Sequence, residues 1–182
     1  MKKMIAVASV AVLVVGCQTT GDYKPVSEKL PSLNVSFTDS AWNGKKLPNG
    51  QQCSKFGGKG STPSMMVSGI PSGVNAVIVE FNDEDYAPLS SGGGHGSIGF
   101  WVSGSSAKLI SAPGETDKMP SGVFIERKNG ATGSYYTAGY LPPCSGGKGN
   151  TYSAVVKAVY KAKKEGEPSK LFAVGNIKLA DY

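Results

Sequence analysis

Glycine and proline interrupt this chain so often that few stretches leave room for a long helix. The sequence holds 25 glycines and 11 prolines among 182 residues. Beyond Leu33 they interrupt the chain about every ten residues, with short β-branched or aromatic runs between them. This rhythm predicts an all-β sandwich or barrel. The clearest predicted strands are Val74 to Phe81, Ile98 to Val102, Tyr152 to Tyr160 and Leu171 to Leu179.

The predicted strand from Tyr152 to Tyr160 also fits a helical period. In a strand, alternate residues share one face: Tyr152, Ala154, Val156, Ala158 and Tyr160, with Ser153, Lys157 and Lys161 on the other. A helix would instead group Val155, Val156, Val159 and Tyr160. The content of valine, threonine and tyrosine favours the strand, with a polar face that carries Lys157.

The first residues have the pattern of a secretory signal that ends in a lipobox. Lys2 and Lys3 precede an apolar run from Met4 to Val15, and Gly16 precedes Cys17. The run is too short for a membrane helix, which needs about 20 apolar residues, while an ordinary cleaved signal remains an alternative. The pattern predicts a signal peptide over residues 1–16 and a lipidated, palmitate-bearing Cys17. The protein would then be a lipoprotein anchored to a bacterial cell-envelope membrane; Gln18 resembles the pattern of outer-membrane lipoproteins.

The remaining chain divides into a tether and one domain. Residues 17–32 are polar, contain two prolines and show no period, which predicts a flexible tether. Residues 33–182 have the length of a single domain. Without the leader, 17 basic and 13 acidic residues remain, so the mature chain carries 17 − 13 = +4. The lysines are scattered, and the dense run at 161–164 is followed by Glu165 and Glu167, so we expect no nucleic-acid partner.

Two cysteines remain once Cys17 is acylated. An even pair in an oxidising compartment is more often a disulfide than two thiols, so we predict a bond between Cys53 and Cys144. It would close a loop of 144 − 53 = 91 residues. Two separate buried cysteines are the alternative.

Two polar elements stand out as candidate functional residues. Asp83, Glu84 and Asp85 follow a predicted strand, and His95, the single histidine, lies in a glycine-rich segment further on. A carboxylate beside an imidazole can fix its tautomer and help to hold a polar ligand. Taken alone, an acidic turn and a loop histidine are more often without a special role.

The order of these elements along the chain resembles a known family. The relevant segments are FTDSAWNGKKLP (37–48), Cys53, STPSMMVSGIPSGVNAVIVEFNDEDYAP (61–88), His95, PSGVFIERKNGATGSYYTAGYLPPC (120–144) and GNTYSAVVKAVY (149–160). This series resembles the bacterial branch of the phosphatidylethanolamine-binding protein family, also called Raf kinase inhibitor-like proteins. The resemblance implies a Greek-key β-sandwich of two antiparallel sheets with little helix. It also implies a pocket at one end for phosphate-type anions and phospholipid headgroups.

The resemblance assigns roles residue by residue. The residues that match the family's pocket motifs are Asp83, Asp85, His95, Pro143, Cys144 and Tyr152. Four positions depart from those motifs, and the first is Glu84, which replaces a proline. Asn150 and Thr151 replace a histidine and an arginine, and Gly96 replaces a tryptophan. We expect the loss of positive charge to weaken anion binding, because hydrogen bonds to charged groups are roughly twice as strong as neutral ones.

The leading functional hypothesis is therefore a non-enzymatic binding lipoprotein. Its ligand site would contain Asp83, Asp85, His95, Pro143, Asn150 and Tyr152, and its ligand would be small and polar or anionic. The alternative is a protein-interaction module, such as an inhibitor or a surface factor, whose pocket has decayed. An enzyme ranks last, because the sequence has no G-x-S-x-G motif, and one histidine without a C-x-x-C gives no metal set. Gly94–Gly99 matches G-x-G-x-x-G, but strand-like residues follow it, so we expect no cofactor.

Overall fold

The computed structural model describes residues 23–164 and 166–182. The predicted signal peptide (1–16), the lipidation site Cys17 and residues 18–22 of the predicted tether lie outside the described residues. Among the residues described, no helix has both the length and the apolar composition needed to cross a bilayer.

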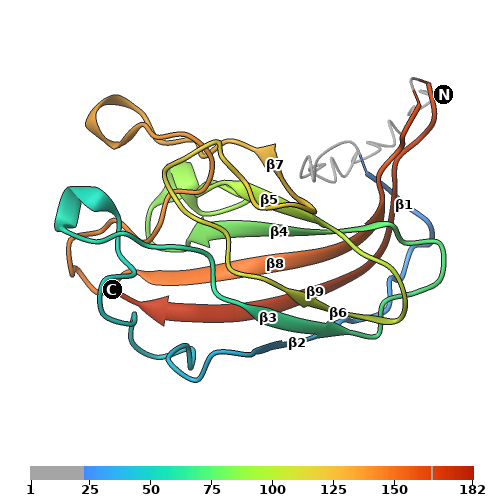
Figure 1. Ribbon diagram of the computed structural model, residues 1–182, viewed down its shortest axis with the longest axis horizontal. Coiled ribbons are helices and arrows are strands. Elements are labelled where there is room, and N and C mark those ends of the chain that lie inside the picture. Colours follow the sequence, from blue (N-terminus) through green and yellow to red (C-terminus); the bar gives the residue numbers. More distant parts are fainter. Residues whose placement is uncertain (1–22, 165) are drawn as a thin grey trace, which may run out of the picture.

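The described chain forms two β-sheets that face each other (Figure 1). The large sheet has the order β1-β9-β8-β4-β5-β7 and the small sheet the order β2-β3-β6. The strands of the large sheet are β1 (Lys24–Pro25), β4 (Ala76–Asp83), β5 (Ser97–Trp101), β7 (Val123–Arg127), β8 (Thr151–Tyr160) and β9 (Lys170–Asp181). Those of the small sheet are β2 (Asn34–Phe37), β3 (Met65–Ser68) and β6 (Ser106–Leu109). Three short 3₁₀ helices lie in loops: η1 (Ser54–Phe56), η2 (Ala87–Leu89) and η3 (Gly133–Tyr135).

The prediction of an all-β fold with two sheets and little helix is confirmed. The four predicted strands are β4, β5, β8 and β9, so the ambiguous segment is a strand and not a helix. Neighbouring strands pair antiparallel, with the exception of β1, which runs parallel to β9. β5 begins directly after Gly96, so no helix follows the G-x-G-x-x-G spacing.

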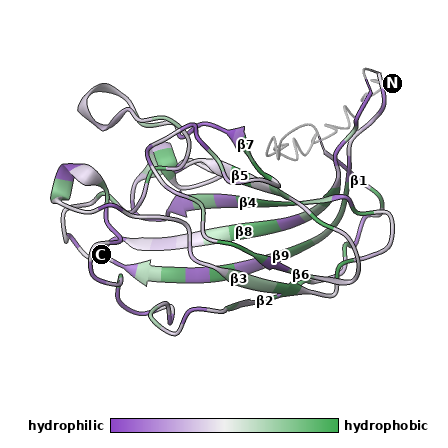
Figure 2. Ribbon diagram, viewed as in Figure 1, coloured by the Kyte–Doolittle hydropathy of each residue, from purple (hydrophilic) through white to green (hydrophobic). Residues whose placement is uncertain are grey.

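The core lies between the two sheets, and β4 runs through its centre. All eight residues of β4 are buried. Val77, Val79 and Phe81 face the small sheet, where they join a cluster that contains Met65 and Leu109. In Figure 2 hydrophobic residues cover the middle of β8, whereas the last residues of β4 are hydrophilic. The strand thus ends in polar side chains at one end of the sandwich, next to a hydrophobic core.

Residues 23–32 differ from the predicted flexible tether. Tyr23 is buried, Lys24–Pro25 form β1, and Ser32 makes a parallel bridge to Val174. A further parallel bridge joins Lys46 to Asp181. The composition of this segment predicted a coil. Pairing with a sheet edge uses backbone N–H and C=O groups, so amino-acid composition does not reveal it.

The predicted disulfide is confirmed. Cys53, just before η1, is bonded to Cys144, and their Cα atoms are 5.3 Å apart. The bond closes a loop of 91 residues. In the chain-entropy model a loop of this length contributes about 4 to 5 kcal/mol of stability. The disulfide joins two loops at the end of the sandwich where β8 begins.

The outer face of the large sheet contains a buried ion pair. Lys157 on β8 was predicted on the face opposite Tyr152 and Ala154, and its side chain is only 3% exposed. Its Nζ lies 2.6 Å from Oε1 of Glu80 on β4, and the Glu80 side chain is 7% exposed. The prediction of the face is confirmed, whereas the burial was not predicted, because alternation along a strand assigns a side and not what covers it.

We predict that Lys157→Met destabilises the protein by about 3 to 5 kcal/mol, because it leaves the Glu80 carboxylate buried without its partner. The matched control is Lys178→Met, which removes an exposed ion pair to Asp181 and should cost no more than about 1 kcal/mol. Urea unfolding measures both free energies. Equal values for the two variants would contradict the importance of the buried pair.

Candidate functional site

A pocket of about 440 Å³ lies at the end of the sandwich where β4 ends and β8 begins. Its lining comes from the end of β4 and from two connections, β4–β5 and β7–β8. The lining residues are Asp83, Tyr86, Pro88, Leu89, His95, Gly130, Ala131, Thr132, Tyr135, Leu141, Cys144, Ser145, Lys148 and Asn150. Three of the predicted site residues, Asp83, His95 and Asn150, are thus brought together in one cavity.

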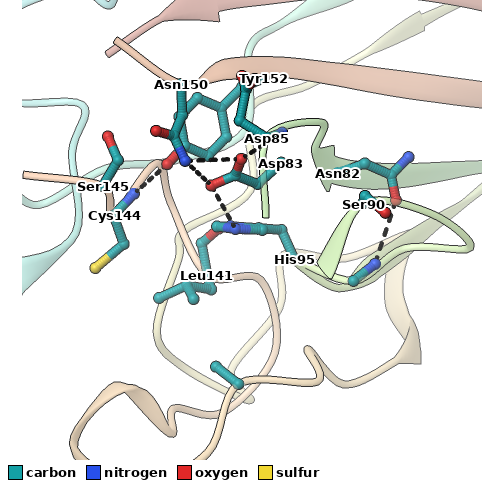
Figure 3. A network of polar contacts seen from close by, with 12 residues as sticks. Asn82, Asp83, Asp85, Ser90, His95, Leu141, Cys144, Ser145, Asn150 and Tyr152 are labelled. Carbon is teal, nitrogen blue, oxygen red and sulfur yellow. Dashed lines mark hydrogen bonds and ion pairs between the residues drawn. The ribbon is translucent and has the colours of Figure 1, made fainter. Parts of the chain in front are cut away.

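Asp83 is the last residue of β4 and is 4% exposed. The β4–β8 ladder sets it opposite Tyr152. Nδ2 of Asn150 lies 2.9 Å from both Asp83 carboxylate oxygens, and Oδ1 also accepts the backbone N–H of Asp85. Figure 3 shows Asn150 and His95 on two sides of this carboxylate. Neutral donors therefore hold Asp83 in place, and none of them cancels its negative charge.

His95 is held at both its backbone and its side chain. Its N–H donates to the Phe81 carbonyl, and its own carbonyl accepts from Leu141 N–H. The ring Nδ1 lies 2.8 Å from the Leu141 carbonyl oxygen. Since a carbonyl only accepts, Nδ1 carries the proton. The ring is thus fixed in one orientation and one tautomer.

Burial lowers the pKa of His95 from 6.5, against the opposite effects of the Leu141 carbonyl and the Asp83 charge. The imidazole is therefore neutral near pH 7, and Nε2 is a hydrogen-bond acceptor. Nε2 lies 4.0 Å from Oδ2 of Asp83. We call these two atoms the acceptor pair. A donor group of a ligand that lies beside both atoms would satisfy them together.

Tyr152 lies behind this pair and does not line the pocket. Its hydroxyl oxygen accepts the Cys144 N–H at 3.1 Å, and its ring packs edge-on against His95 with centroids 5.3 Å apart. Burial raises the pKa of Tyr152 to about 12, partly offset by hydrogen bonds from Ser145 and Cys144. The neutral phenol therefore supports the imidazole and the loop of Cys144.

Like Tyr152, two further predicted site residues lie outside the pocket lining. Asp85 is exposed, and its Oδ2 accepts the Thr151 N–H at 2.7 Å, so it joins the β4 turn to the start of β8. Pro143 is buried, and its carbonyl accepts the Cys53 N–H. Both residues shape the walls of the site from outside.

The structure adds pocket residues that the sequence reasoning missed. Tyr86 and Tyr135 line the mouth, and the exposed Lys148 brings a positive charge to the rim. Lys55 lies over the Tyr135 ring and bonds to Ser134, which joins η1 to the η3 loop. These residues lie in loops, where the sequence has no periodic hydrophobic pattern. Only the nearness of Lys148 to Asn150 in the sequence could have indicated one of them.

A larger groove, of about 760 Å³, runs over the outer face of the large sheet. Its lining includes Glu80, Lys157, Arg127 and Lys178. Three of these four side chains are already in ion pairs with other protein groups. The smaller pocket instead has acceptor atoms that face open space, so we take it as the candidate site. Within the described part of the chain, no cluster of three metal-ligating side chains occurs.

Comparisons with known proteins reveal the fold. E. coli YbcL, described as a new member of the mammalian PEBP family, matches with a TM-score of 0.51 and 22% identity. The match covers 83% of this chain and 98% of that one. A homologue of phosphatidylethanolamine-binding protein from Chlamydia trachomatis matches with a TM-score of 0.50 and 17% identity, over 83% and 97% of the two chains. No protein-family model and no curated protein sequence matches.

These likenesses show that the chain has a fold like that of the phosphatidylethanolamine-binding proteins, as the resemblance in the sequence predicted.

We predict that His95 makes stability depend on pH. Its pKa is lower in the folded protein than in the unfolded chain, so below about pH 6.5 the unfolded chain binds a proton that the folded protein does not. Above that pH, the contribution of the neutral His95 to the free energy of unfolding should be fully present. Below it, the free energy should fall, by at most about 1.4 kcal/mol per pH unit.

Urea unfolding between about pH 7.5 and pH 5 measures this effect in the wild type and in His95→Asn. The asparagine amide can donate to Leu141 as Nδ1 does, but it does not titrate. The difference between the two proteins should therefore shrink toward low pH. A constant difference would show that His95 binds its proton equally in both states.

Proposed function

We propose that this chain is a non-enzymatic lipoprotein of a bacterial cell envelope that binds a small polar ligand in the pocket at the end of the sandwich. The acceptor pair carries the proposal: two buried acceptor atoms, 4.0 Å apart, line a cavity. Oδ2 already accepts from Asn150, but a carboxylate oxygen can accept from a second donor, so a ligand N–H or O–H group beside both atoms would bond to the pair.

The charges of the pocket define the ligand further. The floor contains the Asp83 carboxylate and a neutral imidazole, and therefore favours an ammonium or hydroxyl group over an anion. Lys148, at the rim, provides a positive charge that suits a phosphate. A headgroup-like molecule with an amine at one end and a phosphate at the other would satisfy both ends of the pocket.

A binding role is favoured over catalysis by the neighbours of the imidazole. The hydroxyl of Ser145 donates to the Tyr182 carbonyl, and Cys144 is in the disulfide. Neither is hydrogen-bonded to His95 as a nucleophile is to its base. The lipid anchor and the envelope location rest on the leader pattern that ends at Gly16-Cys17.

Calorimetry with three probes tests the ligand class: O-phosphoethanolamine, ethanolamine and inorganic phosphate. We predict that O-phosphoethanolamine binds best of the three. Asp83→Asn should weaken its binding by about tenfold or more, because a charged hydrogen bond contributes about 1.5 to 3 kcal/mol. Lys148→Gln should weaken only the probes that contain phosphate.

Asp85→Asn is the matched control, since the same change in the same turn lies outside the pocket lining. It should leave all three affinities nearly unchanged. Native mass spectrometry of the full chain, purified from its own envelope in mild detergent, completes the test. If no probe binds and no small molecule accompanies the protein, the proposed function is wrong.

The alternative, a protein-interaction module, is supported by exposed aromatic side chains around the same pocket. Tyr86 and Tyr135 at the mouth are 53% and 39% exposed. Tyr136, next to η3, is 63% exposed, and aromatic residues are enriched in protein interfaces. A Tyr86→Ala, Tyr136→Ala variant that loses an envelope partner while it retains probe binding would favour this function.

A further inference from the structure

The end of the molecule opposite the pocket is basic. Four exposed lysines lie there: Lys24 in β1, Lys163 and Lys164 in the β8–β9 hairpin, and Lys170 at the start of β9. Lys24 pairs directly with Lys170 across the β1–β9 ladder. Figure 1 shows this hairpin projecting beside β1, away from the C-terminus. Within the described part of the hairpin, Glu167 is the one acidic residue beside these lysines. We call this region the basic end.

The pocket end carries charges of both signs, with Lys55 and Lys148 near an acidic turn. β8 runs from Thr151, beside the pocket, to Tyr160, beside the basic end. Its ten residues separate the two ends by about 30 Å. The acidic turn Asp83, Glu84 and Asp85 lies at the pocket end. The two ends of the sandwich therefore differ in charge along the direction of β8.

The predicted lipidation site is close to the basic end along the chain. Cys17 lies six residue positions before Tyr23, and a segment of this length reaches at most about 20 Å. Tyr23 itself is fixed to the domain. It is buried, its hydroxyl donates to Oε1 of Glu126 at 2.8 Å, and the next residue, Lys24, donates its N–H to Ser169. The short connection would keep whatever holds Cys17 near the basic end.

We propose that the basic end lies against an anionic phospholipid surface and that the pocket opens away from the membrane that holds the anchor. The inference rests on the lipid anchor of the proposed function. An acyl anchor restrains position but not orientation, and lysines beside an anionic surface add a second attraction. The exposed Val26, next to β1, adds an apolar side chain to the contact.

This orientation restricts the source of the ligand. The acceptor pair lies about 30 Å from the bilayer surface, which is more than the roughly 8 to 10 Å over which its charge acts at physiological salt. The pocket would thus take a headgroup-like molecule from the aqueous phase, and not from a lipid still in the anchoring membrane.

Lysine acetylation followed by mass spectrometry tests the orientation on the full lipoprotein. The protein is reconstituted into vesicles of phosphatidylcholine alone or with phosphatidylglycerol. With phosphatidylglycerol, the acetylation of Lys24, Lys163, Lys164 and Lys170 should slow by about threefold to fivefold, because the negative surface attracts these amines and keeps them protonated. Lys55 and Lys148, at the pocket end, are internal controls and should not change. Salt at about 1 M should abolish the difference.

The charge variant Lys163→Gln, Lys164→Gln should reduce the protection of Lys24 and Lys170. Equal acetylation in both kinds of vesicle, or protection of Lys55 and Lys148 instead, would overturn the orientation while the anchor stands. The intact mass of the same preparation reports the acyl chains on Cys17. A mass without acyl chains would overturn both the lipid anchor and this inference. Ligand binding in the pocket is tested separately, by calorimetry with the three small-molecule probes.

Discussion

The backbone ladder between β4 and β8 is the constraint on which the rest of the molecule depends. Eight residue pairs, from Ala76 with Val159 to Asp83 with Tyr152, fix the register of the two central strands. Because side chains alternate, a slip by one residue would turn every side chain of β4 to the other face. The ladder therefore determines at once which residues form the core, where Glu80 meets Lys157, and which carboxylate ends the strand beside the pocket.

The pocket illustrates how loops acquire fixed geometry from strands. His95 is in a loop, yet its backbone bonds to Phe81 of β4 and to Leu141, and its ring bonds to the Leu141 carbonyl. The disulfide holds Cys144 beside Tyr152, whose phenol accepts from the Cys144 N–H. The polar atoms that face the cavity are thus oriented before any ligand arrives, which lowers the cost of ordering on binding.

How much the sequence predicts depends on whether a feature is periodic. β-branched residues at period two identified β4 and β8, and motif order identified Asp83 and His95 as neighbours. The burial of Lys157 and its pairing with Glu80 were not predicted, because alternation along a strand does not reveal what covers a face. Tyr23 and Lys24 were assigned to a free coil because parallel edge pairing uses the backbone alone. Tyr135 and Lys148 lie in loops, where position depends on tertiary contacts that leave no local pattern.

The outer edge of β9 has a further consequence for the behaviour of the folded chain. A strand of twelve residues at a sheet edge would offer unpaired N–H and C=O groups to any neighbouring molecule. Here three separate segments occupy that edge, at Lys24–Pro25, Ser32 and Lys46. None of them is long enough to act as a template itself, and Pro25 has no N–H to donate. The polypeptide thereby blocks edge-to-edge polymerisation with its own irregular backbone.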